Sequence, residues 1–193
     1  TADWGFTRDE LPRAAELDAA GVECIQFGCL TMAMEPGNLV IEAWAREQTG
    51  LRTISHDVNL RPALGFEPAS ERVRVERINA FSHLIKASDE DLEWLYETTD
   101  VAPIAKAWSV GKLVLVTRGP DGTDVYRDGE MLFNVPSRKI TVVDTVGAGD
   151  TVGAILVEGI IKHSVSGLNG HVLNAVLHRA AIAAGITVSR AGA

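Results

Sequence analysis

A short turn of small residues carries the strongest chemical signal in this sequence. Gly147, Ala148 and Gly149 stand directly before an apolar segment that has the pattern of a helix. These residues have little or no side chain, so an anion can approach their backbone closely. At a helix N-terminus their N–H groups are free donors, and the helix dipole favours negative charge there. The sequence therefore predicts a turn that can hold a phosphate.

Asp150 directly follows this turn and has two interpretations. The structural one is that a carboxylate in the first turn of a helix complements the helix dipole. The chemical one is a general base, which accepts a proton from a substrate hydroxyl while neighbouring N–H groups stabilise charge on a transferring phosphoryl group. In phosphoryl transfer the protein mostly positions and neutralises, so one carboxylate beside an anion hole is sufficient apparatus.

Two other nucleotide-binding motifs are absent from the sequence. It contains no Gly-x-x-x-x-Gly-Lys-[Ser/Thr] segment, which disfavours a P-loop. No Gly-x-Gly-x-x-Gly follows a first strand, which disfavours a dinucleotide-binding fold.

Composition disfavours several classes of protein. The chain has 193 residues, with 18 Lys and Arg against 26 Asp and Glu, and a formal charge of −8. Such an acidic balance argues against nucleic acid and anionic membranes, because phosphate binding needs a basic patch. The richest apolar run, Thr151 to Ile161, is shorter than the roughly 18 residues of a membrane span and contains Glu158. With no secretory signal and two cysteines in an apolar segment, we expect a cytoplasmic protein.

Hydrophobic patterning predicts strands that alternate with helices. Such alternation indicates βαβ units, hence one α/β domain over residues 1–193 with a central, mostly parallel sheet and helices on both faces. Asp128-Gly129 between two apolar runs is a hairpin signal, and Ser70 and Ser88 are the expected N-caps. The expected strands are residues 22–27, 51–57, 82–86, 112–117, 123–126 and 131–135, and the expected helices are 36–48, 70–80, 88–96, 147–163 and 167–186.

Ligands of such a sheet bind beyond the carboxyl ends of its strands. Asp57, Asn59 and Arg61 follow one of these ends. Asp and Asn are common turn formers, whereas the planar guanidinium of Arg61 suits a phosphate, and from the residues alone both interpretations stay open. Lys86 ends the next strand and could face the nucleotide, but we favour a surface lysine whose apolar stem is buried.

The turn and several other segments resemble a known family. Asp144-Thr-Val-Gly-Ala-Gly-Asp150 is similar to the Asp-Thr-x-Gly-Ala-Gly-Asp signature of the ribokinase-like (PfkB) carbohydrate kinases. His56 to Pro62 resembles the Asp-x-Asn-x-Arg-Pro segment of the fructokinase and 2-keto-3-deoxygluconate kinase branch. Thr117 to Gly122 resembles the family's Thr-x-Gly-x-x-Gly nucleotide loop, and Thr187 to Ala193 its closing segment. The resemblance covers nearly the whole chain and is greatest to bacterial fructokinases.

This resemblance implies a ribokinase-like α/β fold and a C-terminal portion of a longer family chain, without the N-terminal part and β-lid. It also implies ATP-dependent phosphorylation of a sugar hydroxyl, of fructose or a related ketose, with Asp150 as general base and residues 147–150 as anion hole. Catalytic contacts are expected from Arg61, Gly147, Ala148, Gly149 and Asp150, and substrate contacts from Asp57, Asn59, Arg61 and Asp150.

The resemblance further implies ATP, Mg²⁺ and, as an additional candidate, a monovalent cation such as K⁺. The family often has Asn-x-x-Glu where Mg²⁺ and phosphate bind; the matching stretch here is Ser88 to Asp91, with Ser in place of Asn. A helix N-cap is the alternative role of Ser88. The expected Mg²⁺ ligand is Asp91, and the expected monovalent-cation ligands are Asp144 with the carbonyls of Val146 and of the Thr187 to Gly192 segment. The expected nucleotide contacts are Ser88, Thr117, Arg118, Gly119, Asp121 and Gly122.

Other functions stay open at this point. The acceptor could be 2-keto-3-deoxygluconate or that of another ribokinase-like kinase. A protein of a different class, a non-catalytic nucleotide- or sugar-binding module or an inactive fragment, is the alternative to an enzyme. The expected partners are a small sugar and ATP, without nucleic acid or membrane, and a homodimer is a candidate assembly.

Overall fold

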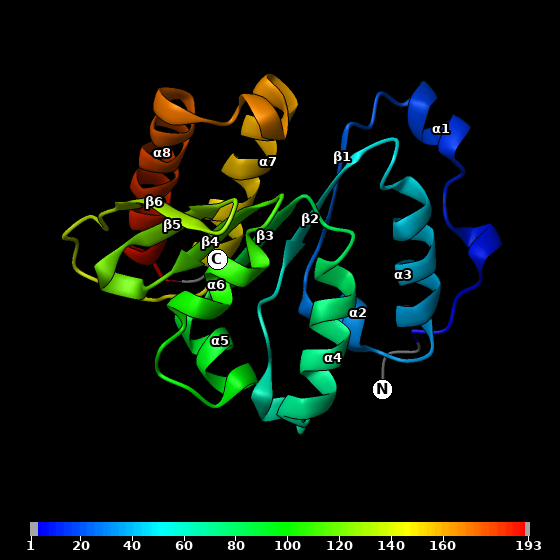
Figure 1. Ribbon diagram of the computed structural model, residues 1–193, viewed down its shortest axis with the longest axis horizontal. Coiled ribbons are helices and arrows are strands. Elements are labelled where there is room, and N and C mark those ends of the chain that lie inside the picture. The colour runs from blue at the N-terminus through cyan, green and yellow to red at the C-terminus, as the bar shows by residue number, and fades with distance from the viewer. Residues whose placement is uncertain (1–3, 192–193) are drawn as a thin grey trace. The chain divides into compact units, whose positions relative to one another are not determined.

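The structure is a computed structural model that describes residues 4–191 (Figure 1). The chain divides into two compact units, one ending at Val101 and the other beginning at Ala102. Each unit carries part of the predicted chemistry and is described by itself.

The first unit contains three parallel strands. They are β1 (Cys24–Phe27), β2 (Thr53–Asp57) and β3 (Leu84–Ser88), and β2 pairs with both of the others. The register places Asp57 opposite Lys86 at the carboxyl ends of β2 and β3. Because these neighbours share a register position, their side chains point to the same face of the sheet.

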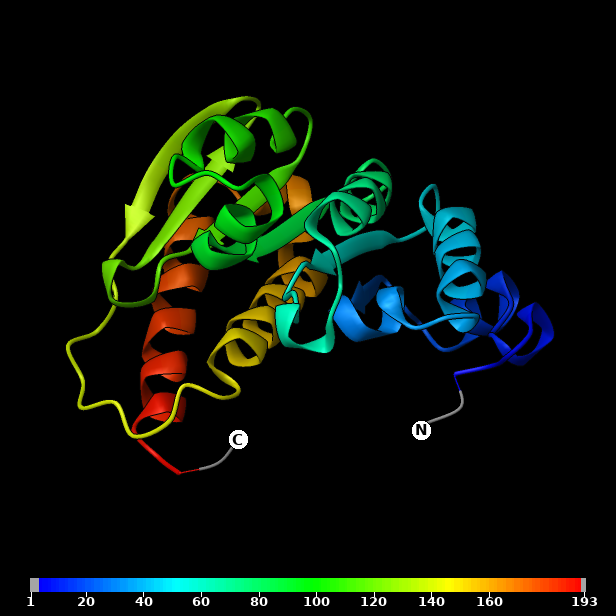
Figure 2. The ribbon, with the colours of Figure 1, turned by 90° about the horizontal axis from the view of Figure 1, so that it is seen from below.

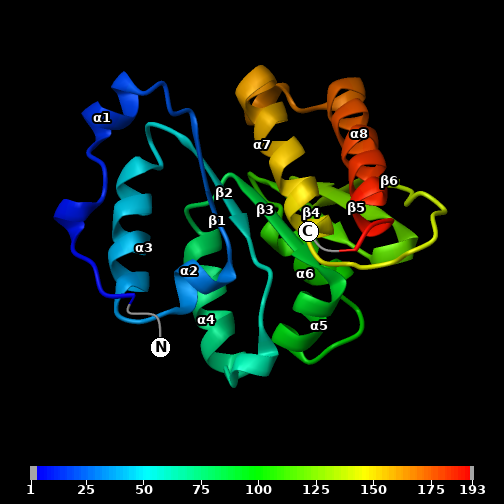
Figure 3. The ribbon, with the colours of Figure 1, turned by 180° about the vertical axis from the view of Figure 1, so that it is seen from behind.

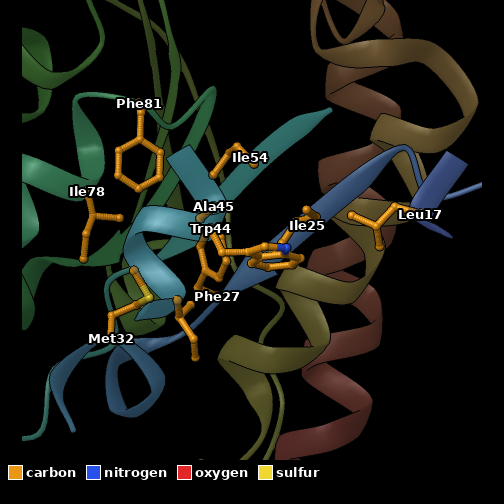
Figure 4. Close-up of a cluster of buried hydrophobic side chains, with 10 residues drawn as sticks. Leu17, Ile25, Phe27, Met32, Trp44, Ala45, Ile54, Ile78 and Phe81 are labelled. Carbon is orange, nitrogen blue, oxygen red and sulfur yellow. The ribbon is translucent and has the colours of Figure 1, made fainter. Parts of the chain in front are cut away.

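Helices and short 3₁₀ turns surround these strands. The α-helices are α1 (Ala14–Ala19), α2 (Cys29–Ala33), α3 (Gly37–Gln48), α4 (Pro68–Asn79) and α5 (Asp89–Tyr96); the 3₁₀ turns are η1 (Arg8–Glu10) and η2 (Pro62–Leu64). A hydrophobic cluster joins α1, α3 and α4 to β1 and β2 (Figure 4). At its edge the indole Nε1 of Trp44 donates a hydrogen bond of 2.8 Å to the carbonyl of Pro12, which satisfies the one polar atom of a buried aromatic ring.

The second unit contains three antiparallel strands. They are β4 (Leu113–Thr117), β5 (Thr123–Arg127) and β6 (Glu130–Val135), in that order across the sheet. Asp128 and Gly129 both have positive φ, which is the backbone that a two-residue hairpin turn requires. The helices of this unit are α6 (Ala102–Trp108), α7 (Ala148–Gly167) and α8 (Gly170–Val188), with the 3₁₀ turn η3 (Gly119–Asp121) after β4.

The helices of the second unit lie on both sides of its strands. Helices α7 and α8 pack side by side on one side, and α6 lies on the other (Figures 1 and 3). The segment of residues 136–147 leads from β6 to α7 and passes the C-terminal end of α8 (Figure 2). Two backbone hydrogen bonds fix this crossing, because the N–H groups of Val143 and Asp144 both donate to the carbonyl of Val188, at 2.7 and 3.2 Å.

The α/β class and the six expected strands are confirmed, although only the first unit's strands are parallel. The predicted start of α4 is wrong: the helix begins at Pro68 rather than after Ser70, with Pro68 in its first turn, where its missing N–H costs nothing. The short helices α1, α2 and α6 were not predicted, because fewer than eight residues give little periodic signal.

By length and composition alone, α8 could cross a membrane, with a mean hydropathy of 1.3 in its most apolar window. It packs along α7 and contacts β6, and Leu173, Val176 and Leu177 are buried. A single helix of this kind is weak evidence for a membrane span, and 28% of its most apolar window is buried inside the protein.

Candidate active site

The Gly-Ala-Gly turn lies at the N-terminus of α7, as predicted. Gly147 is the N-cap residue with φ 80°, and Ala148 begins the helix. This left-handed conformation favours glycine. The Ala148 N–H already donates to the carbonyl of Thr145 at 3.3 Å. No side chain caps the helix, and within the described part of the chain no hydrogen bond engages the N–H groups of Gly149 and Asp150. This helix end therefore offers donors for an anion.

Asp150 occupies the third position of α7 and is exposed. Among residues 4–191 its carboxylate makes no hydrogen bond and no ion pair. The carboxylate is therefore available to accept a proton from a bound molecule, and no internal salt bridge competes for it. This placement is compatible with both the helix-dipole and the general-base interpretation.

The residues around Asp144 tie the turn to the end of α8. One carboxylate oxygen of Asp144 accepts a hydrogen bond of 3.0 Å from the Val146 N–H. The hydroxyls of Thr151 and Thr187 are 2.9 Å apart, and Thr151 also donates to the Gly147 carbonyl at 2.9 Å. The expected cation ligands Asp144 and Val146 thus lie beside one another, while the Gly192 part of the closing segment lies outside the described residues. No group of three or more His, Cys, Asp or Glu that could hold a metal occurs within residues 4–191.

The expected nucleotide loop, Thr117 to Gly122, follows β4 and includes η3. The loop closes on itself through a hydrogen bond of 2.8 Å from the Arg118 N–H to the Gly122 carbonyl. The Arg118 guanidinium pairs with Asp124 at 3.2 Å, so its position is fixed by the neighbouring strand. The loop is therefore a short, internally bonded connection between β4 and β5.

Gly122 is the residue of this loop that tolerates substitution least. Its φ of 95° and ψ of −142° lie in a region that only glycine adopts readily. A Cβ at this position would lie 2.2 Å from the carbonyl oxygen of Val135. We expect Gly122→Ala to lower the free energy of unfolding by about 1–3 kcal/mol, as measured by urea denaturation.

Gly119→Ala is the matched control for this substitution. Gly119 belongs to the same loop and has φ 48°, but a Cβ there meets no atom within 4 Å. It therefore carries only the cost of a left-handed alanine, about 1 kcal/mol. Equal losses in the two variants would show that the contact with Val135 contributes nothing.

In the first unit, Asp57 and Lys86 form a buried ion pair. The Lys86 ammonium lies 2.9 and 2.8 Å from the two carboxylate oxygens of Asp57, and both side chains are less than a tenth exposed. The interpretation of Lys86 as a surface lysine is therefore wrong. Asp57 is therefore engaged within the protein through Lys86.

The loop beyond β2 presents Arg61 at its end. Asn59 has a positive φ of 37°, which asparagine tolerates better than most residues. The Nη1 of Arg61 donates to the Asn59 carbonyl at 3.0 Å, the Asn59 side chain at 2.5 Å and the Leu60 carbonyl at 2.8 Å. Its other guanidinium N–H groups have no hydrogen bond within the described residues. Arg61 is exposed, so a positioned guanidinium edge faces outward.

Ser88 and Asp91 form the N-terminal capping box of α5. The Ser88 hydroxyl accepts the Asp91 N–H at 3.0 Å, and the Asp91 carboxylate accepts the Ser88 N–H at 2.8 Å. The other oxygen of Asp91 accepts the Leu60 N–H at 2.8 Å. The N-cap role of Ser88 is thus confirmed, and Asp91 fastens the loop after β2. The proposed metal role of Asp91 would have to coexist with these two bonds.

Comparison with known proteins agrees with the motifs. The family model described as pfkB family carbohydrate kinase matches residues 37–193, which includes parts of both units. A fructokinase of Rhizobium leguminosarum bv. trifolii is 36% identical over 152 residues, covering 77% of this chain and 46% of that protein. Fructokinase-1 of Oryza sativa subsp. japonica is 30% identical over 201 residues, covering all of this chain and 60% of its own.

Solved structures agree in fold. The aminoimidazole riboside kinase of Salmonella enterica, complexed with aminoimidazole riboside and an ATP analogue, matches all of this chain and 63% of its own with a TM-score of 0.83 at 20% identity. A fructokinase of Vibrio cholerae O395 bound to fructose, ADP and calcium matches all of this chain and 61% of its own with a TM-score of 0.82 at 20% identity. The chain spans about half the length of the first curated relatives. From the extent of the family match and the ribokinase-like fold, this chain belongs to the pfkB family of carbohydrate kinases.

Proposed function

We propose that the protein containing this chain phosphorylates a sugar hydroxyl with ATP, and that the acceptor is fructose or a related ketose. The observation that carries the proposal is the N-terminus of α7, where an exposed Asp150 and the N–H groups beside it have no partner among residues 4–191. Membership of the pfkB family and identity of 30–36% to the two fructokinases above support the same activity.

In the proposed mechanism, Asp150 accepts the proton of the attacking hydroxyl. As the new oxygen–phosphorus bond forms, the bond between the γ-phosphorus and the bridging oxygen of ADP breaks. The N–H groups of Gly149 and Asp150 stabilise negative charge on the transferring group. One carboxylate and a set of fixed donors meet the requirements of this reaction, which asks mainly for positioning and neutralisation.

The proposed role of the first unit is to bind the acceptor or the transferring group. The outward guanidinium edge of Arg61 has the planar donor geometry that suits phosphate and hydroxyl oxygens. Asn59 shapes the turn that carries Arg61, and Asp57 anchors its start through Lys86. In the second unit we assign Thr117 to Gly122 to the nucleotide.

ATP is the proposed cosubstrate, together with Mg²⁺ and a monovalent cation. Mg²⁺ usually binds through few protein carboxylates and keeps several waters. When bound, Mg²⁺ would neutralise charge on the nucleotide phosphates. Asp144, with the Val146 carbonyl, is the proposed site of the monovalent ion; the Vibrio cholerae fructokinase was solved with calcium and, as a double mutant, with potassium. We place the protein in the cytoplasm and leave a homodimer as a proposal.

The acceptor decides between this function and its alternatives. Structural similarity to a riboside kinase and to a fructokinase is nearly equal, so the fold does not select the sugar. The experiment is a coupled ADP-release assay on the complete protein with fructose, 2-keto-3-deoxygluconate, ribose and nucleosides. We expect the highest kcat/KM with fructose. Preference for another acceptor would reassign the substrate, and ATP binding without ADP release from any acceptor would favour a non-catalytic module.

A further inference from the structure

The loop of residues 57–61 is attached to β3 at its start and to α5 near its far end. At the start, the Lys86 ammonium binds both oxygens of Asp57, and the Lys86 carbonyl accepts the Val58 N–H at 2.8 Å. At the far end, Asp91 accepts the Leu60 N–H at 2.8 Å. The side chains of Val58 and Leu60 are buried. The backbone that leads to Arg61 therefore has little freedom.

The ion pair of Asp57 and Lys86 is better suited to fixing geometry than to adding stability. Both side chains are withdrawn from water, and the cost of removing two charges from water can equal or exceed their attraction. An ammonium that meets both carboxylate oxygens holds that carboxylate in one orientation. The ion pair thus fixes Asp57, the residue at which the loop of residues 57–61 begins.

We propose that Lys86 is a positioning residue of the kinase reaction, which acts through Asp57 to hold the loop that presents Arg61. Lys86 touches neither sugar nor nucleotide in this account. The proposal rests on the proposed function for its kinetic consequence, while the placement of the loop can be tested without activity. The group that Lys86 serves indirectly is the acceptor sugar or the transferring phosphoryl group, because Arg61 is assigned to these.

The first test is hydrogen exchange of the complete protein, in wild type and Lys86→Met. We expect the amides of residues 58–61 to lose at least about tenfold more protection than the amides of β5. Lys106→Met is the matched control, because Lys106 is half exposed and only 3.9 Å from Glu130 in a surface pair. Unchanged protection of residues 58–61 in Lys86→Met, or an equal loss throughout the chain, would overturn the proposal.

Lys86→Met leaves the Asp57 carboxylate buried without its cation and could fail to fold. The double variant Asp57→Asn with Lys86→Met removes both charges and relieves that cost. We expect its melting temperature to return toward wild type while residues 58–61 stay poorly protected. Recovery of protection together with stability would show that the pair positions nothing.

The second test is a double-mutant cycle with Arg61→Ala, read as kcat/KM for the acceptor that the wild type uses best. Misplacement of a contact group by about 1 Å can lower the rate on the order of 100-fold. We therefore expect Lys86→Met, introduced into the otherwise wild-type protein, to lower kcat/KM by about 10- to 100-fold. In the Arg61→Ala background the same change should cost less than about threefold, since coupled residues are not additive. Equal factors in both backgrounds would contradict the proposal. A wild type that phosphorylates no acceptor would reject the proposed function, and hydrogen exchange would still decide the role of Lys86.

Discussion

Asp150→Asn is expected to lower the turnover of sugar phosphorylation by about 10²- to 10⁴-fold, the usual contribution of a general base. The amide keeps the size of the side chain but cannot take the hydroxyl proton at neutral pH. Because Asp150 makes no hydrogen bond or ion pair with residues 4–191 and is exposed, the fold should be unaffected. ATP binding, measured by calorimetry, should remain near the wild-type value.

The same variant separates the two interpretations of Asp150. If the carboxylate only complements the dipole of α7, its loss should cost about 0.3–1 kcal/mol of stability and leave turnover close to normal. Glu90→Gln is the matched control, because Glu90 is also an exposed carboxylate in the first turn of a helix, α5. Turnover of Asp150→Asn within a few-fold of Glu90→Gln would remove the base from the mechanism.

The second large effect is a loss of stability in acid caused by His56. This imidazole is fully buried in β2, and burial, with a smaller contribution from the nearby Arg74 charge, lowers its pKa from 6.5 to about 4 despite the hydrogen bond to Asn79. The Nδ1 of His56 lies 2.7 Å from the Asn79 side-chain oxygen, and its buried Nε2 has no hydrogen bond among residues 4–191. The folded protein therefore resists protonation that the unfolded chain accepts.

The sign follows from proton uptake. Between pH 6.5 and about 4 the unfolded state binds the proton and the folded state does not, so stability is complete above pH 6.5 and falls as the pH decreases through this window. The difference in the pKa of His56 between the unfolded and folded states corresponds to a loss of about 3 kcal/mol in the free energy of unfolding once the pH is below both values. The measurement is the free energy of unfolding in urea at several pH values between 7 and 4.

His56→Gln isolates this contribution from the carboxylates that also titrate in acid. The variant should be less stable than wild type at pH 7, and the difference between the two proteins should shrink as the pH falls. His163→Gln, at an exposed position of α7, should follow the wild-type curve. A constant difference between His56→Gln and wild type across the window would refute the assignment.

Sequence reasoning succeeded where the signals were local. The Asp128-Gly129 turn, the N-cap Ser88 and the Gly-Ala-Gly start of α7 are each determined by the conformations open to a few adjacent residues. The strand at residues 112–117 was found because its burial produces a continuous apolar run. The start of α4 was misplaced because Ser70 and Pro68 both suit a helix N-terminus, and only the packed chain selects between them.

Sequence reasoning failed where partners are far apart in the chain. Lys86 and Asp57 are 29 residues apart, and only the parallel register of β2 and β3 places them together. Asp91 similarly reaches the Leu60 N–H across 31 residues. A charged residue at a strand end gives no indication of whether it faces water or a buried partner, so these contacts could not be inferred from spacing.

The general-base role of Asp150 can be measured in a single-turnover experiment on the complete protein, with limiting ATP and excess fructose in a rapid-quench instrument. We predict that wild type transfers the γ-phosphoryl group to the sugar. Asp150→Asn should bind ATP but transfer the γ-phosphoryl group at least about 100-fold more slowly. Equal rates of transfer by the two proteins would show that Asp150 is not the general base, and no sugar phosphate from wild type with fructose or any other acceptor would show that the protein is not a sugar kinase.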